Sequence, residues 1–148
     1  MANARARKRT EAVFSCRYVN DQSNECRYCG APAETRDHVP PLRYAAAQIA
    51  EKHGPWRLVS ACAECNSLLG ARPLLTITDR RRFLLGKYRE RFAKLLAGPR
   101  WTERDFAELG ASLQSAVRAQ ETQRQRAIAR LQHLQTAYPV ETDFAEQS

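Results

Sequence analysis

Four of the five cysteines in this chain form two Cys-x-x-Cys pairs, Cys26/Cys29 and Cys62/Cys65. Each pair makes a tight turn that presents two sulfurs, and two such turns match the tetrahedral geometry and soft ligands that Zn²⁺ prefers. The 32 residues between the pairs must return the chain to its starting point, which a helix and a strand can do. We therefore predict a structural zinc site with four thiolate ligands.

Two alternatives to the zinc site follow from the same residues. The cysteines could form two unrelated buried pairs, or one pair could be a redox-active Cys-x-x-Cys. The fifth cysteine, Cys16, is predicted to be a small buried or half-exposed side chain, or else an alternative ligand. A closed four-thiolate site leaves no open coordination position, so zinc would explain folding and not activity.

The charge of the chain is unevenly distributed. Lys and Arg number 24 against 16 Asp and Glu, and residues 71–104 carry ten basic and three acidic residues. This concentration favours an anionic partner such as nucleic acid, although charge runs are also typical of solvated helix faces. The length of 148 residues fits one domain with modest extensions and excludes a large multidomain enzyme.

Prolines, glycines and capping residues indicate where the helices begin and end. The run after Pro40-Pro41 predicts a helix over 42–53, and β-branched and aromatic residues predict a strand over 56–61. Thr78-Asp79 is expected to cap a helix that ends at Ala97, with Arg80 and Arg81 on its polar faces. Thr102 and Asp105 resemble a capping box that opens one long helix to Thr136.

These elements divide the chain into four predicted segments. They are a basic N-terminal arm and lead-in (1–25), a zinc-binding core (26–75), a helical extension packed on or projecting from the core (76–136) and a tail (137–148). No apolar run approaches the roughly 20 residues that a membrane span requires. The basic N-terminus lacks the apolar region of a secretory signal, so we expect a cytoplasmic protein with no membrane partner.

The residues beside the two cysteine pairs resemble a known family. Asp37-His38-Val39-Pro40 lies between the pairs, and Asn66 directly follows the second pair in the pattern Cys-x-x-Cys-Asn-x-x-x-Gly. This order resembles the HNH endonucleases, in their four-cysteine zinc subtype, and small phage and prophage HNH proteins in particular. The resemblance covers about residues 26–70. It implies an α+β fold, with a small zinc-stapled ββα-metal core and a predominantly helical C-terminal extension.

The resemblance also implies an activity, the metal-dependent hydrolysis of DNA phosphodiester bonds. That reaction needs a nucleophilic water, a base and a cation that neutralises the developing charge. His38 would be the base, since histidine titrates near neutral pH. Asp37 and Asn66 would offer hard oxygen ligands to Mg²⁺ or Mn²⁺. If the chain is phage-encoded, it would act in the bacterial host cytoplasm.

The basic segment would contact the DNA backbone through cationic side chains. The expected contacts are Arg72, Arg80, Arg81, Arg82, Lys87, Arg89 and Arg91. Two positions depart from the family pattern. Arg57 stands where the family has its middle Asn, and Leu69 stands where the family tends to have Lys or Arg, three residues after Asn66. The alternative is therefore a degenerate zinc module that binds nucleic acid or a protein partner through this basic helical arm. A third possibility is an adaptor whose long C-terminal helix pairs with a helix of a protein partner.

Overall fold

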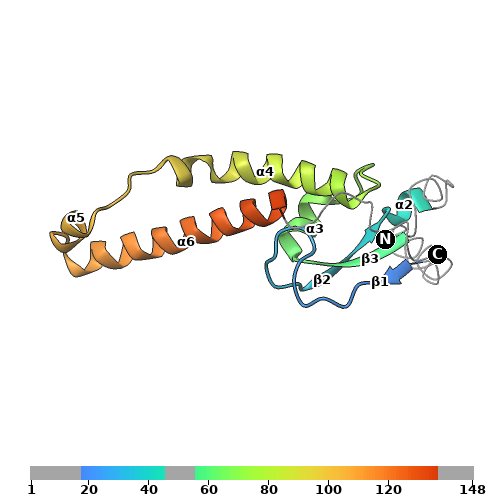
Figure 1. Cartoon of the computed structure of the whole chain (residues 1–148), viewed down its shortest axis with the longest axis horizontal. Coiled ribbons are helices and arrows are strands. Elements are labelled where there is room, and N and C mark those ends of the chain that lie inside the picture. The colour runs from blue at the N-terminus through green and yellow to red at the C-terminus, as the bar shows by residue number, and fades with distance from the viewer. Residues whose placement is uncertain (1–17, 46–55, 137–148) are drawn as a thin grey trace, which may run out of the picture.

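The computed structural model describes residues 18–45 and 56–136, which form a small sheet and a long helical hairpin (Figure 1). The fold class is α+β, as the sequence predicts, with a three-stranded sheet and a mostly helical C-terminal part. The elements in chain order are β1 (Tyr18–Asn20), β2 (Thr35–Val39), α2 (Leu42–Ala45), β3 (Trp56–Ala61), α3 (Ala63–Leu69), α4 (Ile77–Ala97), α5 (Glu103–Ala107) and α6 (Ala111–Thr136).

The sheet has the strand order β1-β3-β2, and β3 at its centre is the strand predicted over 56–61. β2 pairs with β3 in antiparallel register, with Asp37 opposite Val59, whereas β1 pairs with β3 in parallel. Successive side chains on a strand point to opposite faces. Asp37 and Val39 are accordingly buried, while the intervening His38 is only half-buried.

The helical hairpin is formed by α4 and α6, which run antiparallel and lie side by side, with α5 at the end far from the sheet (Figure 1). The buried side chains of α4 follow helical spacing. They are Ile77, Arg80, Arg81, Leu84 and Tyr88. On α6 the buried residues are Arg124, Ala127 and Leu134, all in its second half. The hairpin therefore has its core near the sheet.

Two helix boundaries differ from the prediction. The N-cap of α4 is Thr76, whose hydroxyl accepts from the Asp79 amide at 3.1 Å, and Thr78 lies inside the helix. The capping box at Thr102 is present, but it opens only the short helix α5. The predicted single helix from 102 to 136 is wrong, because α5 ends at Ala107 and α6 begins only at Ala111. Gly110 lies in this interruption, and a glycine inside a helix costs about 1 kcal/mol relative to Ala.

Each long helix of the hairpin is capped by a buried arginine of the other. Arg81 of α4 donates from Nη2 to the carbonyls of His133 and Leu134, at 2.8 and 2.7 Å. Arg124 of α6 donates from Nη2 to the Gly98 carbonyl at 2.8 Å and from Nη1 to that of Leu96. These carbonyls belong to helix ends that lack intrahelical partners and attract cations. The predicted exposure of Arg81 is thus wrong, since its guanidinium is needed inside the hairpin.

Several predictions fall on residues outside the described part of the chain. They concern most of the N-terminal arm, Cys16, most of the helix predicted over 42–53 and the tail at 137–148. α2 does begin at Leu42, the predicted residue. Within the described residues, no helix is long and apolar enough to cross a membrane.

Candidate metal centre and the polar residues beside it

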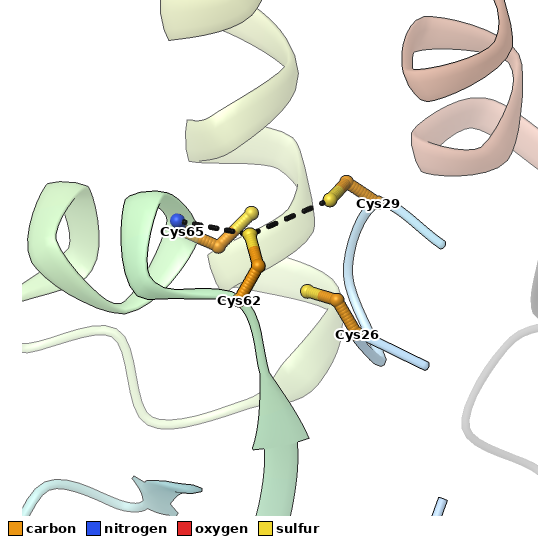
Figure 2. Close-up of side chains that lie close together, drawn as sticks. All are labelled: Cys26, Cys29, Cys62 and Cys65. Atoms are coloured by element: carbon orange, nitrogen blue, oxygen red, sulfur yellow. Dashed lines mark hydrogen bonds between the residues drawn. The ribbon is translucent and has the colours of Figure 1, made fainter. Parts of the chain in front are cut away.

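The four cysteines of the two pairs form one buried cluster, in which the Sγ atoms all lie within 4.8 Å of one another (Figure 2). All four are free thiols, and the Sγ atoms of Cys29 and Cys62 are 3.7 Å apart. A tetrahedral zinc ion with Zn–S bonds of 2.3 Å would separate its sulfurs by about 3.8 Å. The cluster therefore fits a metal ion such as zinc, as the sequence predicts.

Local backbone geometry aims the sulfurs at one point. In the first pair, the Gly30 amide donates to the Cys26 carbonyl at 2.9 Å, and Gly30 adopts the left-handed region with a φ of 73°. In the second pair, Cys62 is the N-cap of α3 and its Sγ accepts from the Cys65 amide at 3.4 Å. One pair thus lies in a glycine turn and the other at a helix start, and Figure 2 shows them facing each other.

Crowding of the four thiols shifts their acidities in opposite directions. Hydrogen bonds from neighbouring thiols lower the pKa of Cys29 to about 6 and also lower the pKa of Cys62. The same interactions raise the pKa of Cys26 and of Cys65. Since thiolates and not thiols bind metals, a metal ion that enters the cluster must displace the protons that the thiols still carry.

The helical hairpin contributes polar side chains around the cluster. The Tyr88 hydroxyl of α4 lies 3.2 Å from Cys65 Sγ, and Tyr88 is fully buried. The Arg130 guanidinium of α6 lies 3.5 Å from Cys29 Sγ and 3.6 Å from Cys62 Sγ. Interactions with the thiols and the adjacent Glu64 carboxylate raise the pKa of Arg130, against the effect of burial. The cysteine cluster is thus enclosed by both parts of the structure.

The carboxylate of Asp37 is buried in an ion pair. Its side chain accepts from the Tyr28 hydroxyl and from Arg80 Nη1 at 2.6 Å, while Arg80 Nε donates to the Leu74 carbonyl at 2.9 Å. Arg80 is 1% exposed and Asp37 5%. Burial raises the pKa of Asp37, and the Arg80 charge and the Tyr28 hydrogen bond oppose that shift. Arg80 therefore lies inside the protein and not on the exposed face where a DNA contact was predicted.

His38 lies in β2 and packs against β1, whereas Asn66 lies in α3 and contacts the start of β2. The His38 ring packs edge-on against Tyr18, with the ring centroids 5.0 Å apart. Asn66, in α3, donates from Nδ2 to Thr35 Oγ1 at 3.1 Å and to the Arg36 carbonyl at 3.3 Å. The structure therefore brings α3 against Thr35 and Arg36 of β2, directly before the Asp-His motif. However, it turns Asp37 towards Arg80, on the strand face opposite His38.

The other predicted DNA contacts are exposed. Arg72 lies over the Phe83 ring, Arg82 is near Asp79, and Arg91 forms an ion pair with Glu64. Surface ion pairs of this kind contribute about 0–1 kcal/mol, so these side chains remain available to another anion. The five exposed cations of α4 are Arg82, Lys87, Arg89, Arg91 and Lys94.

No family model, curated protein or solved structure matches this chain. Its chemistry must be inferred from its own side chains. Four buried thiols can hold a soft divalent ion. Asp37 and Asn66 offer two oxygen donors and the half-buried His38 offers a base, provided that the Asp37 carboxylate is released from Arg80.

Sequence reasoning missed the residues that surround the cluster and the buried carboxylate. Tyr28 lies between the first two cysteines, and no pattern marks it as the partner of Asp37. Tyr88 falls at helical spacing from the buried Leu84 of α4, which marks it as a core residue and not as a neighbour of a cysteine. The position of Arg130 could have indicated a buried role, since it stands between the apolar residues Ile128 and Leu131 in the more apolar half of α6.

Proposed function

We propose that this chain is a zinc-stapled, HNH-type endonuclease that hydrolyses DNA phosphodiester bonds. One observation carries the proposal: β3, which pairs antiparallel with β2, leads directly into α3, and Asn66 of α3 hydrogen-bonds to Thr35 and Arg36 of β2, the residues directly before Asp37. The closed cysteine cluster holds the start of α3 against the first cysteine turn. These contacts support the ββα-metal core that the resemblance implies.

In the proposed mechanism, His38 takes a proton from the attacking water on the exposed side of β2. Asn66 and Asp37 are the residues that would hold Mg²⁺ or Mn²⁺, which would neutralise charge on the phosphate. In the structure Arg80 already supplies a positive charge to Asp37, so these residues fit a divalent cation only if that ion pair opens. Zinc, held by the four cysteines, would serve folding.

The DNA backbone would lie along the exposed basic face of α4. The five exposed cations on this helix could neutralise at most five phosphates, and Arg80 and Arg81 cannot add to them because they are buried. Each neutralised phosphate contributes about −0.9 to the slope of log K against log salt. We therefore expect a slope no steeper than about −4.5 from this face.

The ion pair between Asp37 and Arg80 favours a second candidate function. A buried carboxylate that already has an arginine and a tyrosine as partners is typical of a structural site. The second candidate is therefore a zinc module that binds nucleic acid through α4 without cutting it. Both candidates predict salt-dependent binding, and only the first predicts cleavage.

A plasmid-nicking assay distinguishes the candidates. The zinc-loaded full chain is incubated with supercoiled plasmid and Mg²⁺ or Mn²⁺, beside an EDTA control and the variants His38→Ala and Asn66→Ala. The endonuclease proposal predicts nicking that requires the added cation and falls at least about 100-fold in His38→Ala. Equal nicking by wild type and His38→Ala would refute the mechanism. Salt-dependent binding with no nicking under either cation would establish the second candidate instead.

A further inference from the structure

The hairpin and the cysteine cluster meet at Arg130. Its Nη2 atom is within reach of Cys29 Sγ at 3.5 Å, Cys62 Sγ at 3.6 Å and the Tyr88 hydroxyl at 2.9 Å. Its Nη1 atom donates to Glu64 at 2.6 Å. Cys29 and Cys62 belong to different pairs, so one guanidinium from α6 spans both halves of the cluster.

The charge of the loaded site accounts for a cation at this position. Four thiolates on one divalent ion carry a net charge of −2, and the cluster is buried, where charge is costly unless it is paired. Arginine stays protonated at every relevant pH and carries five donors, so it can contact several acceptors at once. Arg130 therefore offsets part of the negative charge without competing for the metal.

Two further residues fix the guanidinium in place. The Tyr88 ring lies beneath it, 4.5 Å from ring centroid to Cζ, and the Tyr88 hydroxyl also lies 3.2 Å from Cys65 Sγ. The carboxylate of Glu64, two residues after Cys62, holds the guanidinium from the other side. Three of the four cysteines are thus linked to the hairpin through Arg130 and Tyr88.

We propose that Arg130 is an outer-shell residue of the metal centre, and that bound metal and the docking of α6 stabilise each other. Removal of the metal releases the four sulfurs from one fixed arrangement, so Arg130 loses its defined acceptors and the end of α6 detaches. Conversely, loss of Arg130 weakens metal retention. Such coupling between two binding events is reciprocal by thermodynamic necessity. The inference does not depend on the proposed endonuclease activity.

Metal release from the zinc-loaded full chain tests the proposal. An excess of a coloured chelator is added, and the rate of zinc transfer is compared between wild type, Arg130→Met, Arg130→Lys and Arg126→Met. Arg126 is an exposed arginine on the same helix and makes a matched control. We expect release to be about 10-fold to 100-fold faster in Arg130→Met, the usual cost of removing an outer-shell partner. Arg130→Lys should recover part of that loss, and Arg126→Met should remain within about twofold of wild type.

Hydrogen exchange gives a second readout, independent of the chelator. In wild type, stripping the zinc should increase exchange in the last turns of α6 around Leu134. Should Arg130→Met fail to fold, Glu64→Gln removes the charged tether of the guanidinium and is expected to accelerate release by a smaller factor. Zinc release from Arg130→Met, or from Glu64→Gln in that event, at the wild-type rate would overturn the proposal. So would unchanged exchange at the end of α6 after complete zinc removal.

Discussion

Replacing Gly30 with alanine tests how α6 docks on the first cysteine turn. A Cβ atom at Gly30 would lie 2.7 Å from Nδ1 and 3.0 Å from Cε1 of His133, well inside van der Waals contact. Gly30 also has a φ of 73°, a conformation that strains residues with a side chain. Gly30→Ala therefore combines a backbone penalty with a clash against the hairpin.

The two costs can be separated by a double-mutant cycle. Left-handed backbone costs an L-residue roughly 1–2 kcal/mol, and an added carbon in a packed contact costs about 1–3 kcal/mol. Gly30→Ala should thus destabilise the protein by about 2–5 kcal/mol. In the double variant Gly30→Ala/His133→Ala, the ring is absent and only the backbone cost remains. The coupling energy of the cycle should therefore equal the clash, about 1–3 kcal/mol.

Urea unfolding of the four zinc-saturated proteins, followed by circular dichroism, measures this coupling. The slope m should be the same in all four, so that differences in midpoint report stability. The coupling should be favourable, with the double variant more stable than the sum of the single effects implies. Effects that add to within about 0.5 kcal/mol would show that His133 does not pack on Gly30. The docking of α6 on the cysteine turn would then be refuted.

Three further substitutions test the polar interior by the same unfolding measurement. Arg124→Met removes the donors to the carbonyls at the end of α4 and should lower the free energy of unfolding by about 1–2 kcal/mol, because water can replace only part of these bonds. The surface control Arg126→Met should change it by less than about 0.5 kcal/mol. Equal losses of stability in the two variants would contradict the capping role of Arg124. Asp37→Ala leaves Arg80 buried without its carboxylate and should cost about 3–5 kcal/mol, most of which Asp37→Ala/Arg80→Met should restore if the ion pair is the cause. Burial and a nearby arginine lower the pKa of His133, so its contribution to stability is complete above the unfolded pKa near 6.5 and declines as pH falls towards the folded value. Between pH 7 and 5 the wild type should accordingly lose more stability than His133→Gln, and identical pH profiles would contradict this assignment.

The clustering of the four cysteines was predictable from the sequence, because two Cys-x-x-Cys turns in one small chain commonly share one metal site. Two Cys-x-x-Cys pairs have few uses in a chain of this size, and the structure places all four sulfurs within 4.8 Å. The central strand and the α4 helix were also predictable, from β-branched content and helical spacing. These signals come from residues close together in the sequence, and the packing of β3 against β2 and of α4 against α6 keeps the strand and the helix that they predict.

The arginines show why the rest was not predictable. Arg80 and Arg81 stand four and three residues before Leu84, on the face that α4 buries, yet a run of three arginines indicates solvent exposure by composition. Only tertiary contacts reveal their partners, a carboxylate in β2 and the carbonyls at the end of α6. Such partners are 43 or more residues away in sequence, so no local pattern identifies them.

The way the hairpin is held explains how a mostly polar helix can be fixed on a small core. Arg81, Arg124 and Arg130 each cross between elements and donate to defined acceptors, which are helix-end carbonyls or cysteine sulfurs. Apolar contacts alone would allow α6 to slide along α4, since they have little directional preference. Guanidinium groups that reach defined acceptors specify one register. Their charge is also independent of pH, so acid would loosen the hairpin through the groups that the guanidinium groups contact and not through the arginines themselves.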